Sequence, residues 1–129
     1  MNTPEEQECV VRTCRPAFQD LQSLLPRYYA RSELNRQLQK LKWWKPEDPQ
    51  VIDLSWHRIP GTELCELVFD RCSEFPAGLR VVFVQHSPEG TDQRWVWVLG
   101  ALDLTEEFDD IRKTIYVGRS LIVQERATE

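Results

Sequence analysis

The sequence predicts a single α+β domain in which a hairpin of two helices packs on a small, curved, mainly antiparallel four-stranded sheet, followed by a C-terminal helix. Apolar residues recur at helical spacing between residues 15 and 43, and from residue 51 they alternate with polar residues as in strands. Short turns separate the later strands, which makes consecutive strands antiparallel neighbours. The expected order is β-α-α-β-β-β-α over residues 8–129, preceded by a flexible tail at residues 1–7.

The first half of the chain contains one strand and the two helices. Residues 8–13 are short and rich in β-branched side chains, which favours a strand. Pro16 fits the first turn of a helix, and Pro26 ends that helix. A second helix is expected over residues 28–43, because its leucines lie on one face.

The second half contains the remaining strands and the last helix. The predicted strands cover residues 63–70, 79–86 and 94–102, and residues 51–56 are expected only as a short extended piece before them. Trp95 and Trp97 share one face of the last strand, where we expect them to pack in the core. Residues 103–105 are candidate caps for the last helix, because the acidic residues at 106–110 suit its positive N-terminal end.

Composition restricts the class of protein. The 129 residues are 41% hydrophobic and 29% charged, as in one globular domain. No apolar run approaches the roughly 18 residues of a membrane span. The start of the chain is polar and acidic, unlike a signal peptide. We therefore expect a cytoplasmic protein without membrane contact.

The four cysteines do not form a familiar metal motif. Cys9 and Cys14 have four residues between them, and Cys65 and Cys72 have six. Neither spacing is usual for zinc, and no pair of histidines lies at ligand spacing. We expect reduced thiols, no metal and no cofactor.

Charge is unevenly distributed along the chain. The net charge is −5, yet residues 27–45 contain six basic side chains and one acidic, a local charge of +5. Such a stripe can bind a polyanion such as RNA or the ribosome, or it can be a solvated helix face. The candidate RNA- or ribosome-binding residues are Arg31, Arg36, Lys40, Lys42 and Lys45, with Arg71 at a later hairpin.

Three stretches carry a resemblance to a known family. Residues 64–70 (LCELVFD) look like an "L-Y-E-L-R" strand, residues 79–83 (LRVVF) like "Y-R-V-x-Y", and residues 97–101 (WVLGA) like "V-x-L-H-G-F". With the element order, these stretches resemble the RelE/ParE superfamily of type II toxins, including its HigB-like branch. The resemblance spans roughly residues 8–110.

This resemblance implies a function. Most members of the family cleave mRNA in the ribosomal A site without a metal, one branch inhibits DNA gyrase, and each toxin is held inactive by an antitoxin. By this resemblance, the chain is the toxin component of a toxin–antitoxin system. Its expected partners are a cognate antitoxin, the ribosome and mRNA, with a homodimer as a further option.

The candidate catalytic residues are Arg80, Glu66 and His86. Arg80 matches the family's phosphate-binding arginine, and a guanidinium grips phosphate oxygens bidentately. His86 lies six residues further along the same strand and is a candidate acid or base. The alternatives are an ion pair of Glu66 with Arg80 and a strand-end role for His86. His57 is a second histidine candidate, with a loop position as its alternative.

The sequence also departs from the family pattern. Glu66 and Val68 stand near positions where RelE carries lysines, although Glu66 matches the HigB-like branch. Gly100 is followed by no basic residue, and Phe108 replaces a tyrosine that takes part in proton transfer. The alternative function is therefore a non-catalytic binding protein of the same fold, either a gyrase inhibitor or a decayed toxin. A third interpretation is an unrelated α+β interaction domain.

Overall fold

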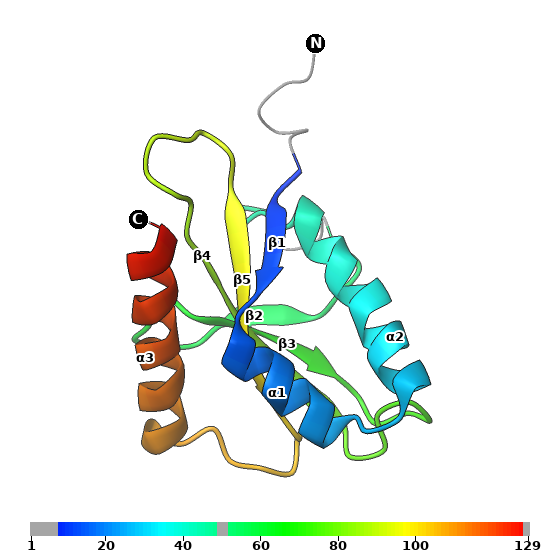
Figure 1. Cartoon of the computed structure of the whole chain (residues 1–129). Helices are drawn as coiled ribbons and strands as arrows, with labels where there is room; N and C mark the ends of the chain where they lie inside the picture. The colour runs from blue at the N-terminus through cyan, green and yellow to red at the C-terminus, as the bar shows by residue number, and fades with distance from the viewer. Residues whose placement is uncertain (1–7, 49–51, 128–129) are drawn as a thin grey trace.

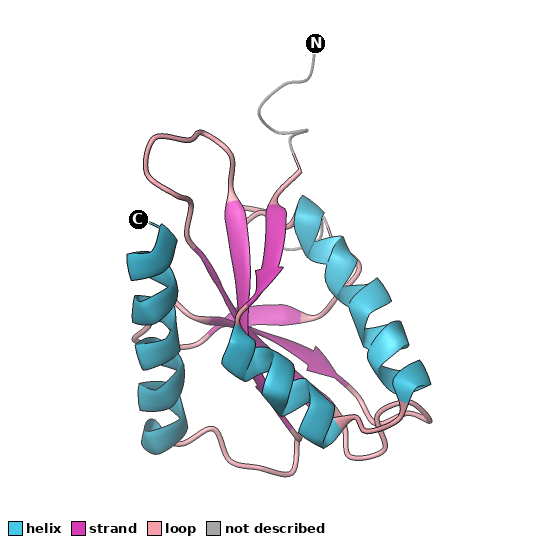
Figure 2. Cartoon of the chain, in the orientation of Figure 1, coloured by secondary structure: helices cyan, strands magenta, loops and turns pink. Residues whose placement is uncertain are grey.

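The computed structural model describes residues 8–48 and 52–127. The tail expected at residues 1–7 lies outside these residues. Within them the chain is an α+β structure with three α-helices, a short 3-10 helix and one five-stranded mixed sheet (Figure 1). Figure 2 shows the sheet strongly twisted, with the helices around it.

Each half of the chain contributes to both helices and sheet. The first half contains β1 (Val10–Thr13), α1 (Arg15–Leu24), α2 (Tyr28–Leu38) and the 3-10 helix η2 (Gln39–Trp43). The second half contains β2 (Trp56–Arg58), β3 (Cys65–Phe69), β4 (Leu79–Gln85), β5 (Trp95–Leu102) and α3 (Asp110–Ala127). The helix expected over residues 28–43 is thus α-helical only to Leu38 and tightens into η2.

The sheet differs from the expected four antiparallel strands. Its order is β1-β5-β4-β3-β2, and β1 runs parallel to β5 while the other neighbours are antiparallel. Strands β1 and β5 can be parallel because no short turn joins them: α1, α2, η2 and strands β2 to β4 lie between them along the chain. The extended piece expected at residues 51–56 contributes only Trp56 to β2, and residue 51 lies outside the described residues.

Helices α1 and α2 cover one face of the sheet, as the sequence predicted. Leu21 and Leu34 from these helices are buried against Val81 and other side chains of that face. Phe83 is the centre of an aromatic group there, with its ring centroid 5.3 Å from Trp44 and 6.4 Å from Trp56. This face holds the larger core cluster.

Helix α3 covers part of the opposite face. Tyr116 and Val123 pack there with Val82, Val84 and Leu99. The helix comes very close to β5 at Gly100, because a Cβ built there would lie 2.6 Å from Arg119 Nη1. Arg119 joins the two helix layers, since its Nη1 donates to Asp20 Oδ2 of α1 at 2.7 Å.

The start of α3 lies later than the sequence indicated. The backbone N–H of Glu106 donates to the carbonyl of Asp103 at 3.1 Å, so residues 103–106 form a turn rather than a cap. Asp109 is the true cap, because its Oδ1 accepts the N–H of Arg112 at 2.9 Å. Among the described residues, no helix combines the length and apolar character needed to cross a membrane.

Candidate functional site

Three polar side chains meet on the face of the sheet that carries α3. Along β3, Cys65 and Leu67 point toward α1 and α2, so Glu66 points to the opposite face. The strand register pairs Glu66 with His57 of β2, and pairs Val68 with Arg80 of β4. We call this group the His57–Glu66–Arg80 cluster.

Glu66 is the centre of the cluster. His57 Nε2 lies 2.5 Å from Glu66 Oε1, and Arg80 Nη1 lies 3.9 Å from Glu66 Oε2. The exposed fractions of the side chains are 55% for His57, 26% for Arg80 and 7% for Glu66. The imidazole and part of the guanidinium are therefore open to a ligand, while the carboxylate lies beneath them.

The cluster contains buried polar atoms whose hydrogen bonds are not satisfied. Glu66 Oε2 and Arg80 Nε are buried and have no hydrogen-bond partner within the described part of the chain. Unpaired buried polar atoms are costly and rare in folded proteins. The buried carboxylate of Glu66 also fixes the orientation of the neighbouring His57 imidazole through their contact. The cluster is therefore the strongest candidate for a chemical site.

His86, the other predicted catalytic histidine, is not part of this cluster. It follows the last residue of β4, and its N–H donates to the carbonyl of Trp95 at 2.9 Å. Six residues of extended strand span roughly 20 Å, which separates His86 from Arg80. Both side chains share a face, as the alternation predicts, but they are too far apart to act on one bond.

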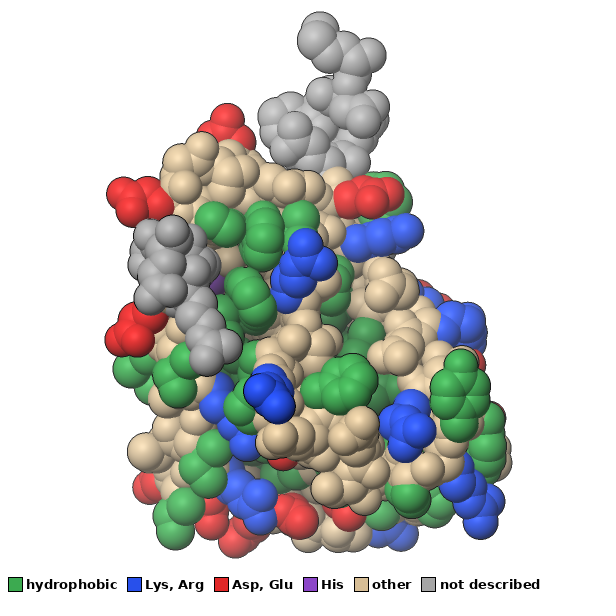
Figure 3. Space-filling model, viewed as in Figure 1, with side chains coloured by type: hydrophobic (Ala, Val, Ile, Leu, Met, Phe, Trp, Pro, Cys, Tyr) green, Lys and Arg blue, Asp and Glu red, His purple; other side chains and the backbone are tan. Residues whose placement is uncertain are grey.

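The predicted basic stripe lies with the helix layer, away from the cluster. It belongs to α2, η2 and the loop after them, and α2 packs on the other face of the sheet. Figure 3 views the side of α1 and α2 and shows Lys and Arg side chains spread over it rather than gathered in one patch. Lys42 contacts Trp43, with Nζ 5.6 Å from the ring centroid.

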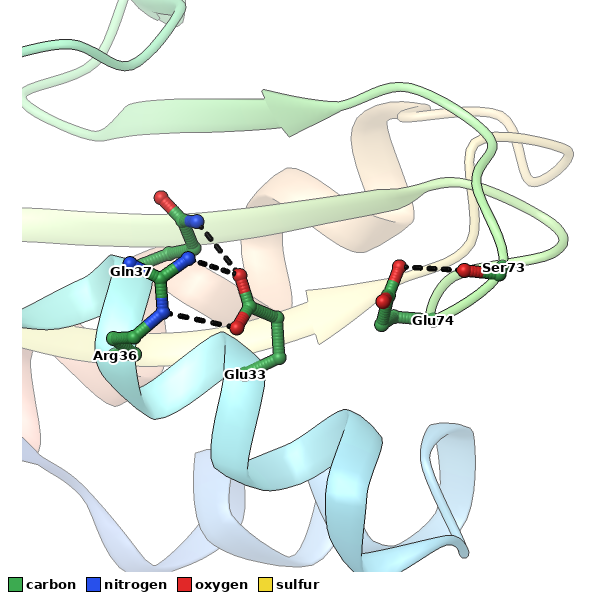
Figure 4. A network of polar contacts seen from close by, with 5 residues as sticks. All are labelled: Glu33, Arg36, Gln37, Ser73 and Glu74. Atoms are coloured by element: carbon green, nitrogen blue, oxygen red, sulfur yellow. Dashed lines mark hydrogen bonds and ion pairs between the residues drawn. The ribbon is translucent and has the colours of Figure 1, made fainter.

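Two members of the stripe are already engaged within the chain. Arg31 donates to the carbonyls of Leu25 and Pro26, which fastens the turn between α1 and α2. Arg36 makes two hydrogen bonds to Glu33, at 2.9 and 2.6 Å (Figure 4). These bonds lower the pKa of Glu33 to about 2. The stripe therefore offers less free positive charge than the sequence suggests.

Arg71 and Phe108, which the sequence singled out, both lie in loops next to the sheet. Arg71 is exposed in the loop between β3 and β4, and Arg80 is the second residue of β4, just after this loop. Phe108 stacks on Tyr116 with ring centroids 5.7 Å apart and planes 5° apart. Burial raises the pKa of Tyr116 to about 12, so this phenol stays protonated at neutral pH.

The cysteines are free thiols. Cys9 and Cys65 are buried, Cys14 is half-buried and Cys72 is exposed. Burial raises the pKa of Cys65 to about 11, which makes it a poor nucleophile. Among the residues that the structure describes, no group of three or more His, Cys, Asp or Glu side chains is arranged to hold a metal ion.

The sequence favoured His86 over His57 as the catalytic histidine, although one feature of the sequence pointed to His57. A turn centred on Pro60 and Gly61, folded as a hairpin, brings residues 57 and 66 opposite each other. Comparison of the chain with protein-family models, curated proteins and solved structures finds no match. The interpretation of the site therefore depends on its geometry.

Proposed function

We propose that this chain is a toxin of the RelE/ParE type that cleaves RNA without a metal, and that His57 and Arg80 are its catalytic residues. The observation that carries the proposal is the His57–Glu66–Arg80 cluster, which combines an exposed imidazole and a partly exposed guanidinium over a buried carboxylate. This combination supplies a proton acceptor and a phosphate ligand. Its antitoxin partner, its action on the ribosome and its cytoplasmic location are parts of the same proposal.

The reaction can be written with these groups. Neutral His57 takes the proton of a ribose 2′-OH through the nitrogen that does not face Glu66. The 2′-oxygen then bonds to the adjacent phosphorus, the P–O5′ bond breaks, and the leaving oxygen takes a proton from water. Arg80 stabilises the additional charge on the phosphoryl oxygens. Glu66 is a positioning residue, since its buried carboxylate accepts from His57 and faces Arg80.

The two histidines of the chain provide a matched test. Four proteins are compared: the wild type and the variants His57→Ala, His86→Ala and Arg80→Ala. Each is expressed in a bacterial host and added to a cell-free translation mixture, and the sites of mRNA cleavage are mapped. We expect His57→Ala to slow cleavage about 10²–10⁴-fold and His86→Ala to leave it nearly unchanged. Circular dichroism checks that each variant is folded. Cleavage that survives both His57→Ala and Arg80→Ala contradicts the proposal, as does a wild type that cleaves no RNA.

A second candidate function is binding without catalysis. Helix α3 exposes an unusual number of large apolar side chains, and these are the kind of surface that a protein partner covers. They are Ile111, Ile115, Val117, Leu121 and Ile122. Growth arrest without RNA cleavage, unchanged by His57→Ala but abolished by Leu121→Asp, would favour this function.

A further inference from the structure

A groove lies at the β1–β5 end of the strand order, whereas the His57–Glu66–Arg80 cluster lies on β2, β3 and β4. The groove has a volume of about 420 Å³ and is formed by residues of β1, α1, β5 and α3. This volume lies within the range of roughly 300–1,000 Å³ that is usual for small-molecule sites. Because Trp97 forms part of its wall, we call it the Trp97 groove.

The wall of this groove has two kinds of surface. Trp97 and Ile122 form apolar parts, while Arg15 and Arg119 contribute positive charge, and no residue that lines the groove is acidic. Arg15 is exposed and makes no hydrogen bond or ion pair within the described residues. Arg119 is partly neutralised by Asp20, so the positive charge available to a ligand comes mostly from Arg15.

The aromatic surface continues beyond the groove along β5. The rings of Trp95 and Trp97 have centroids 5.9 Å apart, and the guanidinium of Arg12 lies 5.3 Å from the centroid of Trp95. Both tryptophans, which the sequence predicted to be in the core, are only half-buried. The two tryptophans of β5 are thus accompanied by arginines from the neighbouring elements β1, α1 and α3. Such a surface suits a ligand that combines flat rings with anionic groups.

We propose that the Trp97 groove binds a nucleotide, with the base against Trp97 and the phosphate at Arg15 and Arg119. The nucleotide is either free or one unit of a single-stranded RNA, and both present the same chemistry to the groove. Aromatic stacking and arginine contacts of this kind bind bases without reading their sequence. Nucleotide binding in this groove does not require RNA cleavage at the His57–Glu66–Arg80 cluster. The two proposals are therefore tested independently.

The test follows the indole N–H signals of the tryptophans by NMR in the full chain. The His57→Ala variant is used so that RNA stays intact. The Trp97 signal is assigned from its loss in Trp97→Phe. Adenosine 5′-monophosphate, adenosine, inorganic phosphate and a twelve-nucleotide single-stranded RNA are titrated in turn. We expect the monophosphate to shift the Trp97 signal and adenosine to bind about tenfold more weakly, since it lacks the charged partner of the arginines.

Charge variants identify the site. Arg15→Gln should weaken binding about tenfold, and Gln19→Arg, at an exposed position in the groove wall, should strengthen it severalfold. Arg27→Gln, which removes an equal charge from the exposed turn before α2, should bind like the parent. RNA that binds more than tenfold tighter than the monophosphate identifies a strand as the ligand, and similar affinities identify the free nucleotide.

Three results would overturn the proposal. A Trp97 signal that stays in place with both the monophosphate and RNA would show that the groove binds no nucleotide. Inorganic phosphate could bind as tightly as the monophosphate, which would show an anion contact alone. If Arg15→Gln and Arg27→Gln weaken binding of the monophosphate equally, the effect comes from the net charge of the protein and not from this groove. RNA cleavage by wild type is scored independently, so its absence does not decide the outcome here.

Discussion

The substitution Gly100→Ala tests how closely α3 approaches the sheet. A Cβ at this position would lie 2.6 Å from Arg119 Nη1 and 2.9 Å from Asp20 Oδ2, and nearer still to Tyr116 Cε1. Carbon atoms in ordinary contact are about 3.5–4.0 Å apart. The added methyl group therefore overlaps three side chains that hold α3 and α1 on β5.

These side chains have little room to move. Tyr116 is buried and stacked on Phe108, and Arg119 Nη1 is held by Asp20 and by the carbonyl of Leu99 at 2.9 Å. Overpacking of this kind costs about 1–3 kcal/mol. Loss of the partly buried hydrogen bonds of Arg119 adds about 1 kcal/mol or more. We expect Gly100→Ala to lower the free energy of unfolding by about 2–4 kcal/mol.

Gly118 provides the matched control within α3. A Cβ there meets nothing within 4 Å, so Gly118→Ala should raise the free energy of unfolding by up to about 1 kcal/mol through helix propensity alone. Urea unfolding, followed by tryptophan fluorescence and circular dichroism, measures both variants. A Gly100→Ala protein as stable as wild type within about 0.5 kcal/mol would refute the close approach. Equal destabilisation by both variants would refute it as well.

Two further predictions concern titration and thiol reactivity. The pKa of Tyr116 is raised to about 12, so its contribution to stability is complete below the unfolded-state pKa near 10 and is lost as the pH rises from 10 to 12. Between pH 9 and pH 11, wild type should therefore lose about 1 kcal/mol more than Tyr116→Phe in urea unfolding, and equal losses would contradict this. An aromatic disulfide reagent should react fastest with the exposed Cys72 and slowest with the buried Cys9 and Cys65. A fast phase that persists in Cys72→Ser would contradict the burial pattern.

Residue periodicity was sufficient to predict most of the elements. Strands β3, β4 and β5 and helix α1 lie within a few residues of their predicted ranges, because each has an unbroken apolar pattern between clear turns. Strand β2 was misplaced because three residues carry almost no periodic signal. The start of α3 was placed too early because the acidic residues at 103–110 suit both a turn and a helix end.

The candidate site was predicted only in part, because strand alternation predicts which face a residue lies on but not which residues of other strands lie beside it. Arg80 and Glu66 were identified from stretches that resemble family motifs, and the register of β3 and β4 brings them together. The choice between His57 and His86 required knowing which strand ends lie near Arg80. A shared face was the only criterion that the sequence supplied, and it does not measure how far apart two residues of one strand are.

The pairing of β1 with β5 has a consequence for how the chain folds as it is made. Among residues 8–48 and 52–127, strand β1 has no other neighbour in the sheet, and the residues it pairs with begin at Trp95. Helix α1, next to β1 in sequence, also packs mainly on β5. During synthesis, β1 and α1 therefore cannot pack on the sheet until β5, which ends at Leu102, has emerged from the ribosome. Until then the apolar side chains of this first part of the chain stay exposed to solvent.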